Sequence, residues 1–226
     1  MTRYSFSALV VLLGTAAIAI AAPAPPDQNR LAPLFPGDSL RGWRVGNWND
    51  VARSPGGVEG RWTLKDGELT SAASGTWLYS PEEYGDFVLQ LEAKVAPGAN
   101  GGIAIRFPVE GDPAYRGMEV QVIDADAEIH KSIGPADKTG AVYDELVPAV
   151  TARPSGEWNA LEITCRGPRL TVLLNGKPAV DADLSKETSK RSRGVPLAER
   201  PRRGRLGFQN IDGTVAYRKL LIRRLD

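Results

Sequence analysis

The strongest constraint on the fold is an alternation of apolar and polar residues with period two, which recurs along most of the chain. From Phe87 to Val95 every second residue is apolar, and Gln90, Glu92 and Lys94 fall between them. Such alternation is typical of a strand with one buried face, whereas no helical period of 3.6 is sustained over eleven residues. About a dozen such strands without crossover helices disfavour a parallel sheet. We therefore predict an all-β fold, a two-sheet antiparallel jelly-roll sandwich.

Dipeptides that end in glycine mark tight turns between these strands. Asp66-Gly67 lies between Trp62–Lys65 and Glu68–Ser71, and its residues accept the positive φ values of a two-residue hairpin. Gly167-Pro168 and Asn175-Gly176 bound three antiparallel strands after residue 160. Asp212-Gly213 predicts a final hairpin of Arg205–Asn210 with Thr214–Arg224.

The N-terminus has the pattern of a secretory signal. Arg3 precedes an apolar run from Ala8 to Ala22, and Ala19-Ile20-Ala21 offers the small-residue pattern of a cleavage site. We predict a signal peptide over residues 1–21, a Pro-rich linker over 22–30 and one domain over 31–226. A retained anchor is the alternative, although prolines end the run directly. A periplasmic or secreted protein without stable membrane insertion is the expected product.

Charge and cysteine content exclude several classes of function. With 28 basic and 27 acidic residues the chain has no overall field that would attract nucleic acid, and none is expected as a partner. Cys165 is the single cysteine, so no internal disulfide forms, and its alternation with Leu161 and Ile163 predicts a small buried residue. His130 is the single histidine, which gives little support to a Ser-His or Cys-His triad.

Polar residues interrupt two apolar strands and define the candidate site. Alternation places Arg106 beside Ala104 on one face of its strand, and it places Glu119 and Gln121 together on theirs. Asp124 ends the second strand, where a bend can turn it to either face. We expect these side chains to line a concave sheet surface. A cross-strand ion pair between Arg106 and Glu119 on a solvated face is the alternative.

Three further features have a functional and a structural interpretation. Asp124, Asp126, Glu128 and His130 alternate, which suits an oxygen-rich metal site, but an acidic surface loop explains them as well. We expect no resident cofactor, with calcium or another divalent ion as the alternative.

Residues 184–205 carry eight basic and two acidic side chains, so they form a solvated loop or a lip for an anionic substrate. Of the five tryptophans, Trp48 in a polar loop is the candidate for stacking on a sugar. Trp158 is the strongest candidate for the core.

Nine sequence blocks occur in a characteristic order. They are LFPGDSLRGW (34–43), WTLKDGEL (62–69), YGDFVLQLEAKV (84–95), NGGIAIR (100–106), GMEVQVID (117–124), TGAVYD (139–144), GEWNALEI (156–163), LNGK (174–177) and GRLGFQNIDGTVAYRKLLIRRL (204–225). Together they resemble the 3-keto-disaccharide hydrolase family over essentially the whole predicted domain. The resemblance implies a concanavalin-A-like sandwich and cleavage of 3-keto-glycosides, with a sugar substrate as the partner.

The chain departs from the family pattern in two places. Asn100-Gly101-Gly102 stands where the family usually has Asn-Ser-Gly, and Asn210-Ile211 follows Gln209 where the family often has His-Gly. If that histidine is catalytic in relatives, another group must do its work here.

The resemblance implies roles for the candidate residues. A C3 ketone acidifies the C2 proton, so cleavage needs a base, an oxyanion stabiliser and an acid for the leaving oxygen. Arg106, Glu119 and Asp124 are the expected catalytic residues, and Gln121, Tyr143, Gln209 and Trp48 are expected to bind the substrate. Direct hydrolysis by paired Glu119 and Asp124 is an alternative, and so is a non-catalytic carbohydrate-binding module.

Overall fold

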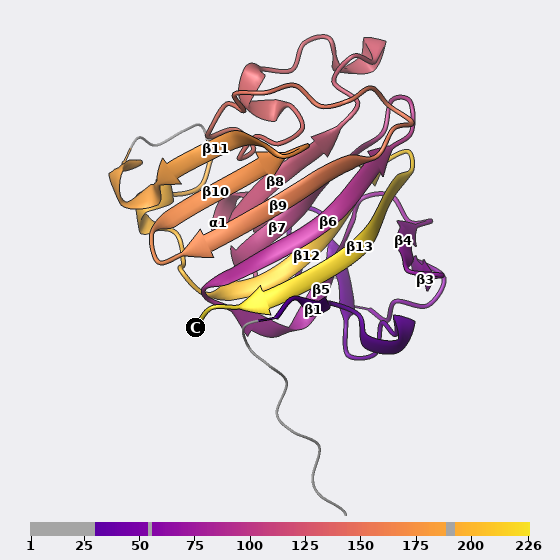
Figure 1. The fold of residues 1–226 in the computed structure, drawn as a ribbon. Helices are drawn as coiled ribbons and strands as arrows, with labels where there is room; N and C mark the ends of the chain where they lie inside the picture. Colours follow the sequence, from indigo (N-terminus) through magenta and orange to yellow (C-terminus); the bar gives the residue numbers. More distant parts are fainter. Residues whose placement is uncertain (1–29, 54–55, 189–192) are drawn as a thin grey trace, which may run out of the picture.

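The computed structural model describes residues 30–53, 56–188 and 193–226. The predicted signal peptide, residues 1–21, and the predicted linker up to residue 29 lie outside this range. Two antiparallel sheets pack face to face, which confirms the predicted jelly-roll sandwich (Figure 1).

The larger sheet has eight strands in the order β11-β10-β9-β6-β13-β4-β3, with β1 also paired to β13. Its strands are β1 (Ala32–Pro33), β3 (Trp62–Lys65), β4 (Glu68–Ser71), β6 (Phe87–Val95), β9 (Asn159–Arg166), β10 (Arg169–Leu174), β11 (Lys177–Asp183) and β13 (Val215–Arg224). The second sheet has five strands in the order β2-β5-β12-β7-β8. They are β2 (Arg44–Asn47), β5 (Thr76–Tyr84), β7 (Asn100–Phe107), β8 (Met118–Ile123) and β12 (Gly204–Asp212).

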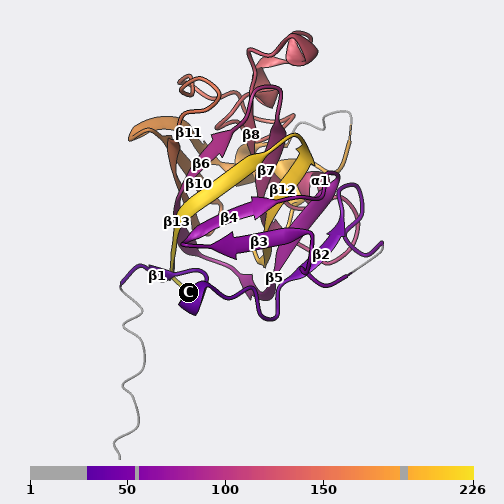
Figure 2. The same cartoon turned by 90° about the vertical axis from the view of Figure 1, so that its right-hand side faces the viewer.

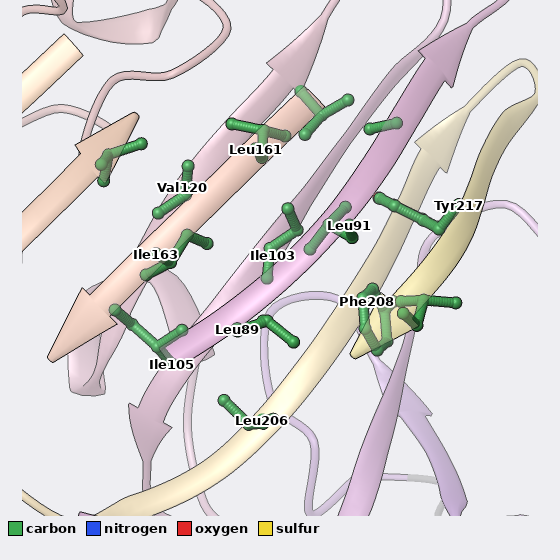
Figure 3. Close-up of a cluster of buried hydrophobic side chains, with 14 of the residues drawn as sticks. Leu89, Leu91, Ile103, Ile105, Val120, Leu161, Ile163, Leu206, Phe208 and Tyr217 are labelled. Atoms are coloured by element: carbon green, nitrogen blue, oxygen red, sulfur yellow. The ribbon is translucent and has the colours of Figure 1, made fainter. Parts of the chain in front are cut away.

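The core lies between the inner faces of the two sheets. Alternation along β6 and β9 supplies the apolar side chains of the eight-stranded sheet, and alternation along β7 and β8 supplies those of the other. Figure 3 shows Leu89, Leu91, Leu161 and Ile163 facing Ile103, Ile105 and Val120 across this core. Cys165 is fully buried in the same cluster, as its spacing predicted.

The hairpins predicted from local turns were partly wrong. The Asp66-Gly67 hairpin forms as β3 and β4, and β9, β10 and β11 form the predicted antiparallel trio. Asp212-Gly213, however, joins β12 to β13, which belong to different sheets, so the turn carries the chain across the sandwich (Figure 2). The hairpin cannot form because β12 is paired on both edges by β5 and β7, and β13 by β6 and β4.

The prediction for Trp158 was also wrong. Its ring lies at the surface, only partly buried, with the Arg218 guanidinium 4.0 Å and the Lys94 ammonium 4.5 Å from its centroid. Contacts with these two cations replace the core contacts that its position after a turn suggested. In the part of the chain that the structure describes, no helix has the length and apolar character needed to span a membrane.

Candidate functional site

The candidate site is a hollow on the outer face of the five-stranded sheet, the face that points away from the eight-stranded sheet. One row of residues crosses this face from β8 through β7 to β12. Gln121 lies opposite Gly102, and Gly102 lies opposite Gln209. The glycine between the two amide side chains leaves space above the middle strand, and the Glu119 carboxyl occupies it.

A second row runs parallel to the first, two residues further along each strand. Glu119 lies opposite Ala104, and Ala104 lies opposite Gly207. Ala104 lies in the buried cluster that also contains Trp77, Tyr79 and Phe107, so the hollow itself lies over the first row, with the long polar side chains of β8 at one side. Because the sheet face alternates strictly here, the strand sequences alone specify this arrangement.

Loops surround this part of the sheet, and the hollow that they enclose has a volume of about 150 Å³. Besides Glu119, Gln121 and Gln209, the lining residues are Trp48, Asn100, Asp112, Ala114, Tyr115, Tyr143, Arg193 and Ile211. Asp112 caps the short helix α1 (Pro113–Arg116), and its Oδ1 accepts the Ala114 N–H at 3.0 Å. The helix thereby presents Tyr115 to the hollow.

Glu119 is the most unusual group in the hollow. Its side chain is almost fully buried, yet its Oε1 has no hydrogen-bond partner among the described residues. Burial raises the pKa of this carboxyl well above its ordinary value, and the nearby charge of Asp112 raises it further. Burial therefore favours the protonated form of Glu119, which carries a proton that it can donate.

A second buried polar atom faces the same space. Asn100 lines the hollow, and its Oδ1 is also buried without a hydrogen-bond partner in the described part of the chain. Two unpaired buried oxygens in one hollow are rare in proteins, because each loses its hydration without compensation. A ligand that donates hydrogen bonds to both atoms would remove that penalty.

Asp112 is the second carboxyl of the hollow. Burial raises its pKa, while the hydrogen bond from Ala114 and the charge of Arg193 lower it. Glu119, in contrast, has only causes that raise its pKa. Burial is the largest cause for Asp112, so its pKa is also raised, but two partners oppose that rise and none opposes it at Glu119. Of the two carboxyls, Glu119 is therefore the better suited to act as the general acid and Asp112 as the base.

Two tyrosines form one wall. The Tyr115 and Tyr143 rings meet edge to face with their centroids 6.1 Å apart, and their hydroxyls share a hydrogen bond. Burial raises the pKa of both phenols. Each hydroxyl therefore stays protonated at neutral pH and can donate to a ligand.

Tyr217 supports the floor from below. It belongs to β13 in the opposite sheet, and its buried hydroxyl lies 3.0 Å from the carbonyl oxygens of both Gly102 and Gln209. A Cβ at Gly101 would stand 3.2 Å from this hydroxyl and 2.5 Å from the Gln209 oxygen. The glycine that replaces the family's serine thus leaves room for this contact between the sheets.

Five of the predicted site residues meet in the hollow: Trp48, Glu119, Gln121, Tyr143 and Gln209. The other two, Arg106 and Asp124, do not line it.

Arg106 does not share a face with Glu119, which corrects the prediction. Its φ of 53° marks a bulge where the register with β12 shifts, so Phe107 joins Ala104 in the outer apolar cluster. The Arg106 guanidinium is fully buried and donates to the Gly85 oxygen at 2.8 Å. Its other nitrogens donate to the Gly167 oxygen and the Asp86 carboxylate, each at 2.9 Å. Through these contacts Arg106 links the end of β7 to the turns that contain Gly85, Asp86 and Gly167, at the end of the eight-stranded sheet.

Asp124 is likewise placed elsewhere. Its Oδ2 accepts the Gly98 N–H at 2.8 Å, and the residue lines a separate cavity with Asp126 and Lys138. The side chains of the alternating acidic segment do not converge on one point as metal ligands would. His130 Nδ1 instead contacts the Asp124 carbonyl oxygen. No group of three or more His, Cys, Asp or Glu side chains suited to a metal ion occurs within residues 30–53, 56–188 and 193–226.

Sequence reasoning missed Asn100, Asp112, Tyr115 and Arg193. Asp112 followed by Pro113 is a recognisable helix start and could have been found. Tyr115 carried no local signal, because loop packing brings it to the sheet, and Arg193 was noted only as part of the basic segment 184–205.

The described residues 193–205 of the basic segment pack against the fold and do not form a freely solvated loop. Arg200 is buried in an ion pair with Glu145 and donates to the Ala114 and Gly117 oxygens, each at 3.1 Å. Arg193 stands at the rim of the hollow with its guanidinium 5.5 Å from the Tyr115 ring centroid.

Comparison with known proteins agrees with this architecture. Residues 31–223 match the family described as 3-keto-alpha-glucoside-1,2-lyase-like domain. A crystal structure of a "putative glycosyl hydrolase" from Parabacteroides distasonis is 28% identical, with a TM-score of 0.75, and the match covers 87% of this chain and 100% of that one.

A second structure with the same description, also from Parabacteroides distasonis, is 24% identical with a TM-score of 0.70, covering 85% of this chain and 93% of that one. The carbohydrate-binding module CBM66 from Bacillus subtilis is 16% identical with a TM-score of 0.50, covering 80% and 95%. These two share the fold. No protein with a curated description matches the chain.

Proposed function

Because the chain belongs to the 3-keto-alpha-glucoside-1,2-lyase-like family, we propose that it cleaves the glycosidic bond of a 3-keto-glycoside by elimination and rehydration. The observation that carries the proposal is Glu119, a buried neutral carboxyl with an unpaired oxygen in a hollow lined by hydrogen-bond donors. Buried titratable groups with strongly shifted pKa values are concentrated at catalytic sites.

The chemistry divides between the two carboxyls. Asp112, as the base, takes the proton from C2, which the neighbouring C3 ketone has made acidic. The C1–O bond then breaks as a C1=C2 double bond forms, and Glu119 gives its proton to the leaving oxygen. Water adds to C1 in the reverse sense, giving a proton to Glu119, while Asp112 returns its proton to C2. The sum of both halves is hydrolysis, and both carboxyls end as they began.

The polar residues of the hollow stabilise the charge that develops on the C3 oxygen. The amides of Gln121 and Gln209 and the hydroxyl of Tyr143 are donors fixed on three separate elements. Fixed donors aimed at a developing oxyanion typically contribute on the order of 3 kcal/mol each to lowering the barrier. They take the role that the sequence had suggested for Arg106.

The departure from the family at Asn210-Ile211 fits this assignment. Ile211 lines the hollow and offers no titratable group, so the base comes from another wall. Asp112 supplies it from the start of α1.

Glu119 also favours an enzyme over a non-catalytic binding module. Sugar hydroxyls are bound well by amides and ionised carboxylates, so a module gains nothing from a buried carboxyl that is kept neutral and unpaired. The free-energy cost of burying such a carboxyl is expected at a site where its proton is transferred during the reaction.

The test is turnover of a 3-keto-α-glucoside by the unaltered protein and by Glu119→Gln. We expect the variant to lose at least about a hundredfold in kcat, because a general acid contributes roughly 10²–10⁴-fold. Glu157→Gln, a change at an exposed carboxyl, is the control. Equal turnover by unaltered protein and Glu119→Gln would overturn the proposal, and sugar binding without turnover would establish the binding module.

Reaction in D2O separates the two mechanisms. Elimination and rehydration place deuterium at C2 of the released 3-keto-sugar once the Asp112 carboxyl has exchanged its proton with the solvent, whereas direct hydrolysis leaves that hydrogen in place. Mass spectrometry of the product, corrected for the non-enzymatic exchange of the free keto-sugar, gives the answer.

We also propose that the mature enzyme acts in the periplasm or outside the cell. The apolar run and the Ala19-Ile20-Ala21 pattern support removal of residues 1–21. N-terminal sequencing of the protein recovered from a secreting host should begin at Ala22, and a start at Met1 or Thr2 would contradict the proposal.

A further inference from the structure

The hollow accommodates only part of a glycoside. Its volume of about 150 Å³ is below the ~300–1,000 Å³ of pockets that enclose drug-sized ligands. A single sugar ring therefore occupies the floor, and the group on the other side of the scissile bond must rest at the rim.

The rim has two different sides. On the side of α1, the Arg193 guanidinium stands over the Tyr115 ring and lowers the pKa of Asp112 by its charge, so this cation already has partners within the protein. On the side of β2 and β12, Trp48 and Ile211 present apolar surface.

Trp48 is a rigid and accessible platform. Its side chain belongs to a residue that is 39% exposed, although large apolar residues of this chain are mostly buried. The backbone is held at both ends, because its N–H donates to the Gly75 oxygen at 3.0 Å and its oxygen accepts the Trp77 Nε1–H at 2.9 Å. A Cβ at Gly75 would stand 3.3 Å from Trp48 Cδ1, so this glycine leaves space for the ring edge.

We infer that Trp48 binds the leaving group of the substrate, and that the enzyme accepts 3-keto-glycosides whose leaving group is a ring with a flat apolar face. Aryl groups and the C–H face of a second pyranose share this chemistry. The inference deepens the proposed function and rests on it. It makes the enzyme one that removes a terminal 3-keto unit, with the ring beyond the bond stacked outside the hollow.

The test compares three 3-keto-α-glucosides, with methyl, 4-nitrophenyl and glucosyl leaving groups, on four proteins: unaltered, Trp48→Ala, Trp48→Phe and Trp158→Ala. Trp48→Ala should raise KM about tenfold for the two ring-bearing substrates, as expected for loss of one stacking contact. It should leave KM for the methyl substrate within twofold, and kcat for all three within about threefold. Trp48→Phe should restore most of the loss, and Trp158→Ala, which removes a tryptophan on the opposite sheet, should behave as the unaltered protein.

Each outcome decides a different point. A response of the aryl substrate alone identifies an aryl leaving group, and an equal response of both rings identifies the shared apolar face. Equal losses on the methyl substrate, or no loss on any, would overturn the inference while the proposed function stands. No turnover of any 3-keto-glycoside by the unaltered protein would overturn the proposed function and this inference with it.

Discussion

The carboxyl group of Glu119 lies directly over Gly102. A Cβ built on Gly102 would stand 1.8 Å from Glu119 Oε1 and 2.6 Å from its carboxyl carbon, far inside any permitted contact. Glycine at this position of β7 is therefore what allows the acid on the neighbouring strand to reach across the floor. The backbone itself is not strained here, since Gly102 does not have a positive φ.

Gly102→Ala should separate activity from folding. The clash is with the far end of a flexible side chain, so the sheet can form while Glu119 swings aside. We expect kcat for a 3-keto-glycoside to fall by at least tenfold, since displacements of about 1 Å at a reacting group cost up to about 10²-fold. Gly57→Ala is the matched control, because a Cβ there meets nothing within 4 Å. Unchanged kcat in Gly102→Ala would contradict the placement of Glu119.

Glu119 should also make stability depend on pH in an unusual direction. Its folded pKa is raised above the ordinary 4.5, so the unfolded chain releases this proton before the folded one does. The free energy of unfolding therefore carries no penalty from Glu119 below about pH 4.5 and falls as pH rises toward the folded pKa, by on the order of 1 kcal/mol per pH unit.

Glu119→Gln removes this titration. Urea denaturation at several values from pH 4.5 to 8 should show the variant gaining stability relative to the unaltered protein as pH rises. Glu157→Gln should show no such trend. A stability difference independent of pH would show that Glu119 is ionised in the folded protein.

Arg106→Met should destabilise the protein without removing its chemistry. The change leaves the Gly85 and Gly167 oxygens and the Asp86 carboxylate without their shared donor. Breaking a buried ion pair by removing one partner typically lowers the free energy of unfolding by about 3–5 kcal/mol, and the partial exposure of Asp86 places this case at the lower end.

At a temperature where Arg106→Met remains folded, kcat should stay within about threefold of the unaltered protein. Thermal denaturation monitors the first effect and single-substrate kinetics the second. A hundredfold loss of kcat in a variant with full stability would return Arg106 to the catalytic role that the family resemblance implied.

The case of Arg106 shows where reasoning from the sequence is reliable. Regular alternation predicted β6 with its observed bounds and placed Glu119 and Gln121 on one face of β8. A single bulge at Arg106 reverses the alternation of the last residues of β7, and nothing in a stretch of ordinary strand residues announces it. The same limit applies to the Asp212-Gly213 turn, whose local chemistry suits a hairpin although distant strands already occupy both edges.

The walls of the hollow lie beyond local prediction for a related reason. Asp112 and Tyr115 reach the sheet through a short helix, and Arg193 through a long segment anchored by the buried Arg200–Glu145 pair. Their positions depend on how loops pack, while the floor depends only on strand register. The sequence thus predicts Glu119 and the two amides of the hollow better than Asp112.

Tyr143→Phe tests whether the tyrosine wall acts on the reacting sugar. The hydroxyl lies close enough to Glu119 for that carboxyl to raise the pKa of the phenol, so it can reach a ligand in contact with both. Removing one fixed donor to a developing oxyanion should lower kcat roughly 10²-fold with little change in KM.

Tyr84→Phe, at the far end of β5, is the control and should leave kcat within twofold. Burial raises the pKa of Tyr143 above its ordinary value, so activity should lose nothing to ionisation of this phenol between pH 6 and 9. A kcat of Tyr143→Phe equal to that of the control would remove Tyr143 from the reaction and leave it as part of the wall.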